Sequence, residues 1–131
     1  MKVRLILTAL LRSLTGVWIE TGDVMNITMN EIKLQCRIDD DTEDDLLKVF
    51  LESAKATIEN YTNRKLFEEL PTDNVPQNAV EISADLKIAI LMLVAYLYEN
   101  RIGLNESTQT QFELLPPTIK MIVERYTYIA V

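Results

Sequence analysis

The chain has 131 residues, which suits one domain of ordinary size. Acidic side chains outnumber basic ones by 20 to 13, and the resulting net charge of −7 disfavours general binding of nucleic-acid phosphates. Histidine is absent and Cys36 is the only cysteine. This composition excludes histidine-based catalysis, Ser–His and Cys–His nucleophile pairs, nearly all zinc sites and an intrachain disulfide.

Residues 1–24 differ from the rest of the chain. Lys2 and Arg4 precede a short apolar run, as in a signal peptide, but Arg12 interrupts the run and no small-residue cleavage site follows. We therefore predict either a packed N-terminal arm or an upstream extension before an alternative start at Met25 or Met29. Residues 25–131 are predicted to form a single helical domain.

The first helix is predicted from a capping box, in which Thr28 is followed three residues later by Glu31. This helix is short and ends near Ile38.

An acidic run at residues 39–45 follows the first helix. A calcium loop needs glycine at its sixth position and glutamate at its twelfth, where this run places Asp44 and Phe50. We instead predict that Thr42 caps the next helix and that the acids complement its positive end, with weak cation binding or a basic partner as the alternative.

The second helix is predicted over about 43–63. Charged residues of both signs mark its solvent-exposed face, and Asn63 and Arg64 are typical of a helix C-terminus. Its apolar face carries Leu47, Phe50, Leu51, Ala54, Ile58 and Tyr61.

Residues 65–82 form a connector in which Pro71 and Pro76 exclude a regular helix. Ser83 is predicted to cap a helix from Ala84 to about Arg101. No residue from 88 to 98 is charged, yet this run is too short to span a bilayer. The helix is therefore apolar on all sides and central to a core, or shared with a neighbouring subunit. One apolar seam contains Leu86, Ile90, Leu93 and Leu97; the second contains Ile88, Met92, Ala95 and Tyr98.

Residues 102–117 are predicted to be a polar loop or an extended arm. Thr118 is predicted to cap a last short helix that carries Ile119, Ile122, Val123 and Tyr126 on one face. The apolar, β-prone tail 126–131 indicates that something covers it. The predicted fold is mainly α: a small bundle of about four helices, a long loop or arm between the last two, and possible short β pairing at the termini.

No catalytic, cofactor-binding or metal site is predicted. Acid–base catalysis by a pair of carboxylates requires burial that makes their two pKa values differ, and the sequence gives no sign of such burial. Asp85 is explained by the dipole of its helix, and Tyr96 and Tyr98 by packing. Lys87 is a candidate amine nucleophile only in principle, because nothing in the sequence indicates a partner for it.

Six short sequence segments occur in a fixed order along the chain: EIKLQCRID at 31–39, EDDLL at 43–47, IENYTNR at 58–64, LP at 70–71, LKIAILMLVA at 86–95 and YENR at 98–101. Taken together, they resemble the head–tail connector family of long-tailed phages and prophages. The similarity covers residues 29–126. Cys36 stands where the family pattern has leucine, and residues 1–24 have no counterpart in that pattern.

The resemblance implies a virion structural protein at the head–tail interface, made in the host cytoplasm, without enzymatic activity. It implies a homo-oligomeric ring of about a dozen subunits beneath the portal protein, which bridges the portal to tail-side connector or stopper proteins. DNA would pass through the ring without sequence-specific binding, and no membrane or cofactor is involved. The acidic balance suits such a channel, because a basic lining would retain DNA.

A closed ring needs two different contact surfaces on each subunit. The candidate subunit-interface residues are Ile88, Met92, Tyr96, Tyr98, Arg101, Phe112 and Leu114. Two alternatives remain: a cytoplasmic homo-oligomeric interaction module without a virion role, and an enzyme that uses carboxylates with a divalent metal.

Overall fold

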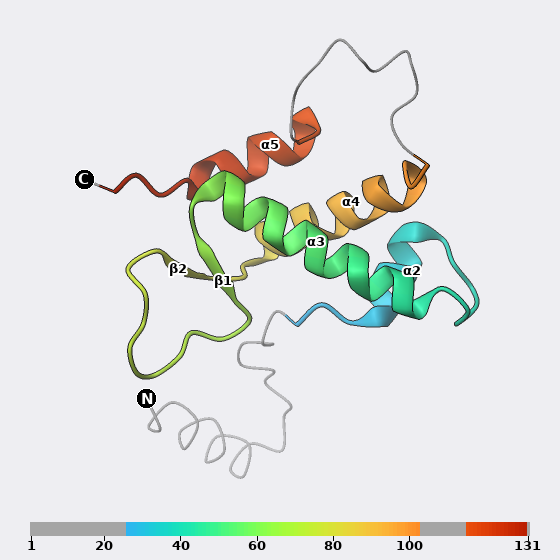
Figure 1. The fold of residues 1–131 in the computed structure, drawn as a ribbon, viewed down its shortest axis with the longest axis horizontal. Helices are drawn as coiled ribbons and strands as arrows, with labels where there is room; N and C mark the ends of the chain where they lie inside the picture. Colours follow the sequence, from blue (N-terminus) through green and yellow to red (C-terminus); the bar gives the residue numbers. More distant parts are fainter. Residues whose placement is uncertain (1–25, 103–114, 131) are drawn as a thin grey trace, which may run out of the picture.

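Four α-helices and a two-stranded sheet make up residues 26–102 and 115–130, the part of the chain that the computed structural model describes (Figure 1). The mainly helical fold predicted from the sequence is confirmed. The predicted arm at 1–24 and most of the predicted loop at 102–117 lie outside the described residues. In chain order the elements are α2 (Met29–Cys36), α3 (Asp44–Thr62), β1 (Lys65–Phe67), β2 (Ala79–Glu81), α4 (Ala84–Glu99), α5 (Pro117–Val123) and the 3-10 turn η2 (Glu124–Tyr126).

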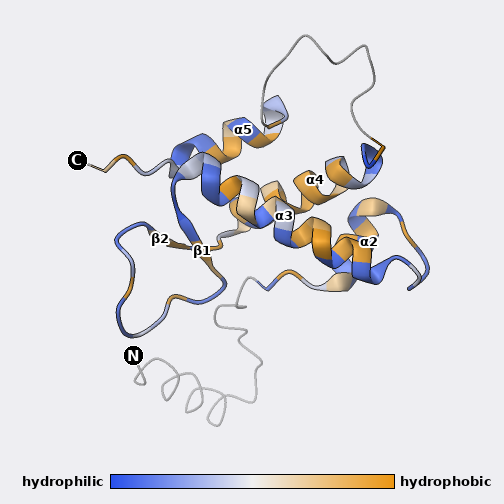
Figure 2. Cartoon of the chain, viewed as in Figure 1, coloured by the Kyte–Doolittle hydropathy of each residue, from blue (hydrophilic) through white to orange (hydrophobic). Residues whose placement is uncertain are grey.

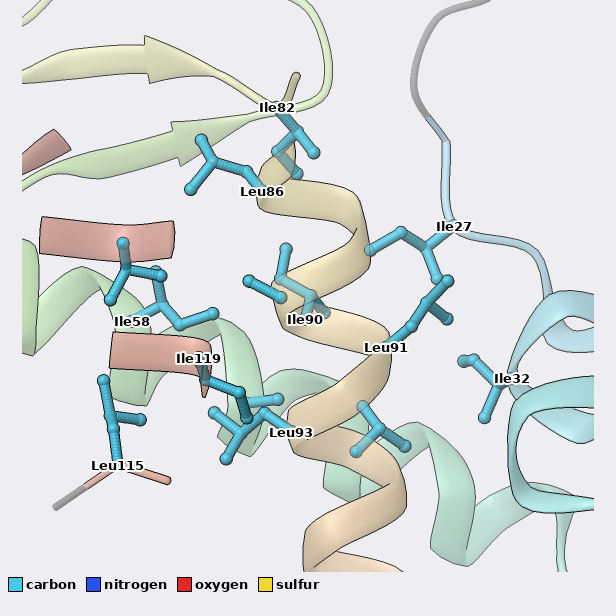
Figure 3. Close-up of a cluster of buried hydrophobic side chains, with 14 of the residues drawn as sticks. Ile27, Ile32, Ile58, Ile82, Leu86, Ile90, Leu91, Leu93, Leu115 and Ile119 are labelled. Carbon is cyan, nitrogen blue, oxygen red and sulfur yellow. The ribbon is translucent and has the colours of Figure 1, made fainter. Parts of the chain in front are cut away.

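Helix α4 lies at the centre of the core. Figure 3 shows α2 on one side of it and α5 on the other, with Leu91 directed toward Ile27 and Leu93 close to Ile119. Helix α3 packs along α4 as well. The buried residues of α4 are Leu86, Ala89, Ile90, Leu91, Leu93 and Val94. Contact with α2, α3 and α5 therefore explains most of the apolar character of α4, which Figure 2 shows by hydropathy.

Helix α2 begins with the predicted capping box. The Glu31 amide donates to Thr28 Oγ1 at 3.3 Å, and the Thr28 amide donates to Glu31 Oε2 at 2.9 Å. The helix ends at Arg37, whose backbone is left-handed with a φ of 58°. Both ends of this short helix are thus satisfied by local contacts, and its one buried residue, Ile32, faces the core.

Helix α3 starts one residue later than predicted, and the prediction that Thr42 caps it is wrong. Glu43 occupies the N-cap position, and Thr42 Oγ1 donates instead to Asp40 Oδ1 within the acidic turn. The predicted core face is confirmed, with Leu47, Ala54 and Ile58 buried. Asn63 ends the helix in the left-handed conformation, as expected for asparagine at this position.

The connector contains two strands that the sequence did not predict. Strands β1 and β2 are parallel, with Lys65 opposite Ala79 and Phe67 opposite Glu81. The Ile82 amide then donates to the Phe67 carbonyl at 2.9 Å. This pairing fixes where the chain enters α4, with Ser83 at its N-cap.

Helix α5 begins at Pro117, with Pro116 at the N-cap, so the prediction that Thr118 caps it is wrong. A proline in the first turn loses no hydrogen bond there, and its fixed φ favours the helix. Ile119 and Val123 are buried as predicted, while Ile122 and Tyr126 are half-buried.

The described part of the C-terminal tail is tied to the end of α3. The Tyr128 amide donates to the Thr62 carbonyl at 2.7 Å, and Arg64 Nε donates to the Tyr126 carbonyl at 2.8 Å. The Arg64 guanidinium also lies over the Tyr128 ring. The chain thus covers Tyr128 in part, whereas Ile129 remains 77% exposed. Across the ranges described, no helix is long and apolar enough to cross a membrane.

Candidate subunit interface

The two predicted seams of α4 have different environments. Leu86, Ile90 and Leu93 of the first seam are buried, so that seam belongs to the subunit's own core. The second seam is only partly covered: Ile88 is 51% exposed, and Met92 is half-buried. At 3.6 residues per turn, Ile88, Met92 and Ala95 share one side of the helix. We call Ile88, Met92 and Ala95 the α4 outer face.

Tyr98, the fourth residue assigned to the second seam, does not lie on the α4 outer face. Its ring meets the Phe50 ring edge-on, with centroids 6.5 Å apart, and its hydroxyl donates to Glu43 Oε2 at 2.5 Å. Both partners belong to the start of α3. The seam assignment failed because Tyr98 is turned by about 60° from Ala95, and by about 80° from Ile88, toward α3.

Glu43 joins the start of α3 to the end of α4. Arg101 Nη1 donates to Glu43 Oε1 at 2.9 Å, and its guanidinium lies 5.1 Å from the centre of the Tyr98 ring. The hydrogen bond from Tyr98 and the bond from Arg101 lower the pKa of Glu43. The bond to Glu43 in turn raises the pKa of the Tyr98 hydroxyl. Tyr98 and Arg101 thus have partners inside the subunit.

The remaining candidates divide between half-buried and undescribed residues. Tyr96 is half-buried and packs against the core cluster. Phe112 and Leu114 lie outside the described residues. Hence the structure brings Ile88 and Met92 together on one surface, places Tyr98 and Arg101 at the α3–α4 junction, and leaves the interface role of all seven residues as a prediction.

Apolar residues on α3 were missed as candidates. Val49 is 62% exposed and Leu46 is 39% exposed, although both lie in a helix with a well-formed core face. The sequence contained a signal for them: the charges of α3 fall on one flank, so part of its outer side has no charged residue.

Ion pairs account for the main charged groups near the site. Lys33 Nζ contacts Asp41 and lies 2.7 Å from Asp44 Oδ1, which ties the acidic turn to α2. Lys87 Nζ lies 2.6 Å from Glu31 Oε1, so the interpretation that nothing pairs with Lys87 is wrong. Among the described residues, no group of three or more Cys, Asp or Glu side chains is arranged to hold a metal ion.

A comparison with known protein families identifies the chain. The family model for phage gp6-like head–tail connector proteins matches residues 26–126. Comparisons with curated proteins and with solved structures find no significant match. The matched segment begins just before the Thr28 capping box and ends at Tyr126, so it includes every helix and strand described above. This chain therefore belongs to the phage gp6-like head–tail connector family, and its role is that of a structural protein of the phage virion.

Proposed function

We propose that the protein forms a closed ring beneath the portal, joins the portal to tail-side proteins and surrounds the path of the DNA. The observation that carries the proposal is the family match over residues 26–126. The α4 outer face supports it, because Ile88 exposes half of an aliphatic side chain beside the half-buried Met92. Residues of this kind are typical of the dry centre of a contact between subunits.

The charge of the chain supports a position around DNA. The net charge is −7, and the acidic turn before α3 presents exposed carboxylates at Asp39, Asp40 and Asp41. Carboxylates repel the phosphate backbone, so DNA moves past such a surface without being held. We propose that the ring guides DNA without binding it, so gel-shift assays at about 0.1 M salt should show no retention of DNA.

The ring is tested by native mass spectrometry and electron microscopy of the full-length protein, alone and with its portal protein. Ile88→Asp places a charge on the α4 outer face and should abolish rings, with an unchanged far-UV circular dichroism spectrum. Val75→Asp is the matched control: Val75 is 47% exposed against 51% for Ile88, and it lies in the loop between β1 and β2. This control should still form rings.

Two results would contradict the proposal. One is a wild-type protein that stays monomeric at high concentration and does not join the portal. The other is a soluble dimer that binds a cytoplasmic protein and is missing from purified virions.

A further inference from the structure

The side of α4 that carries the α4 outer face is apolar in the middle and acidic at both ends. Asp85 and Glu99 are exposed and lie on the same side of the helix as Ile88, Met92 and Ala95. Their fourteen-residue separation corresponds to about 21 Å along the helix axis. A segment that covers this side must therefore be apolar and must carry positive rather than negative charge.

Residues 1–24, the predicted N-terminal arm, have the composition that this side of α4 requires. Of the first 19 residues, twelve are apolar, three are basic and none is acidic; the basic residues are Lys2, Arg4 and Arg12. Residues 20–131 hold the other ten basic side chains and all twenty acidic ones, which gives them a net charge of −10. The folded part of the chain therefore attracts the arm, whereas it repels a second folded part of the same charge.

The described chain begins beside the α4 outer face. Lys87 Nζ donates to the Asn26 carbonyl at 3.1 Å, so the first described residue lies against the first turn of α4. Leu91 is directed toward the buried Ile27 (Figure 3). Around the helix axis Leu91 is about 40° from Ala95. The arm therefore joins the folded part of the chain next to the α4 outer face.

We propose that the first 19 residues of the arm pack on the α4 outer face of their own chain. Residues 20–25 span at most about 20 Å, so this linker keeps the arm close to the first half of α4. A linker this short gives the arm an effective concentration in the millimolar range at its own face, which favours that face over the face of another copy. The apolar side chains of the arm cover the middle of the face, and its cations lie near the two carboxylates.

This contact has a consequence for assembly. The α4 outer face is also the surface proposed above for the contact between subunits, so a docked arm and a neighbouring subunit exclude each other. Assembly then requires that the arm leave the face, and an arm that binds less tightly should allow rings to form at lower protein concentration. This consequence rests on the proposed function, whereas the contact of the arm with α4 does not.

The contact is tested by intrachain disulfides in the full-length protein, with Cys36→Ser as the background because Cys36 is the only native cysteine. Thr8→Cys or Ser13→Cys in the arm is combined with Ile88→Cys or Ala95→Cys on α4. The four resulting variants sample different registers of the arm along the face. Under mild oxidation at least one of them should form a disulfide within the chain, seen as a faster-migrating monomer on a non-reducing gel.

Val49 on α3 provides the matched control. Val49 is 62% exposed against 51% for Ile88, so both positions are open to an approaching thiol. Residues 13–26 can extend over about 45 Å, which lets an arm without a preferred position reach Val49→Cys as well. The disulfide from Ser13→Cys or Thr8→Cys to α4 should form at least about tenfold faster than the disulfide to Val49→Cys.

Charge reversal in the arm tests the cause of the contact and its consequence. Arg4→Glu with Arg12→Glu should slow the disulfide to α4 at least about tenfold and should lower the protein concentration needed for rings about fivefold. Lys48→Glu with Arg125→Glu is the control, because it changes the net charge by the same amount at two exposed positions of the described chain. This control should leave the rate of the disulfide unchanged.

The outcomes separate the contact from the proposed function. Fast disulfides within the chain support the contact, and they do so even for a protein that never forms rings or joins the portal, which overturns only the proposed function. Disulfides that link different chains assign the arm to a neighbouring copy and overturn the contact proposed here. Equal rates at α4 and at Val49→Cys also overturn it, as does an arm that forms no disulfide and instead binds the protein to vesicles of anionic lipid. Rings that form in either of these last two cases leave the proposed function standing.

Discussion

Arg37 holds a left-handed backbone conformation at the end of α2, with a φ of 58°. For a residue with a Cβ this conformation costs roughly 1–2 kcal/mol, whereas glycine adopts it without that penalty. Glycine also loses more entropy on folding, by about 0.4–1 kcal/mol. Arg37→Gly should therefore stabilise the protein by a net of about 0.5–1 kcal/mol in urea unfolding. Arg37→Ala keeps the Cβ and serves as the control, and an equal gain in that variant would contradict the backbone explanation.

Glu43 gives the subunit an acid-sensitive contact. Its pKa in the folded protein is lowered by the Tyr98 hydroxyl and by Arg101, while the unfolded value is about 4.3. Between these two values the unfolded chain binds more protons, so the stabilisation is present above about pH 4.3 and is lost as the pH falls through the folded pKa. Glu43→Gln should have a lower melting temperature than the wild type at pH 7, and this difference in melting temperature should become smaller toward pH 3. A gap that stays constant in thermal melts from pH 7 to pH 3 would contradict this reading.

The N-terminal ends of the helices show which N-cap residues a sequence pattern can predict and which it cannot. Thr28 is a cap because Glu31 returns the hydrogen bond, and that reciprocal pattern is local. The sequence predicts that Thr42 caps α3, but its hydroxyl donates to Asp40, while Glu43 at the N-cap accepts a hydrogen bond from Tyr98 of α4. Thr118 lost its predicted role because two prolines precede it. Single threonines thus give an ambiguous signal, and the deciding contacts come from elsewhere in the fold.

Substitution of these three threonines checks the assignment. Thr28→Ala should destabilise the protein by about 1 kcal/mol in urea unfolding, because it leaves an amide of the first turn without its partner. Thr42→Ala and Thr118→Ala serve as controls at exposed positions and should change the stability by less than about 0.5 kcal/mol. A large loss in Thr118→Ala would show that this hydroxyl supports α5 after all.

Helix α4 shows how far the candidate site was predictable. Its charge-free run predicted a central helix with more apolar surface than one domain covers, and the structure shows that helix with Ile88 half exposed. The same pattern assigned Tyr98 to the wrong surface, because the spacing of residues along α4 does not show which side of α4 packs against α3. The strands β1 and β2 were missed because each has only three residues and both lie among prolines and turns.

At the scale of the whole molecule, the net charge opposes assembly, whereas the exposed apolar surface favours it. Repulsion between copies with a net charge of −7 weakens as salt screens it, while contact through apolar side chains such as Ile88 and Met92 does not depend on screening. If the α4 outer face holds the ring together, raising salt from about 0.02 M to 0.3 M should increase the ring fraction in native gels or sedimentation. The subunit's melting temperature, measured on monomeric Ile88→Asp, should change little over the same range, since its surface ion pairs contribute little. Rings held by ion pairs would behave in the opposite way and dissociate as salt rises, which would contradict a contact made mainly by apolar side chains.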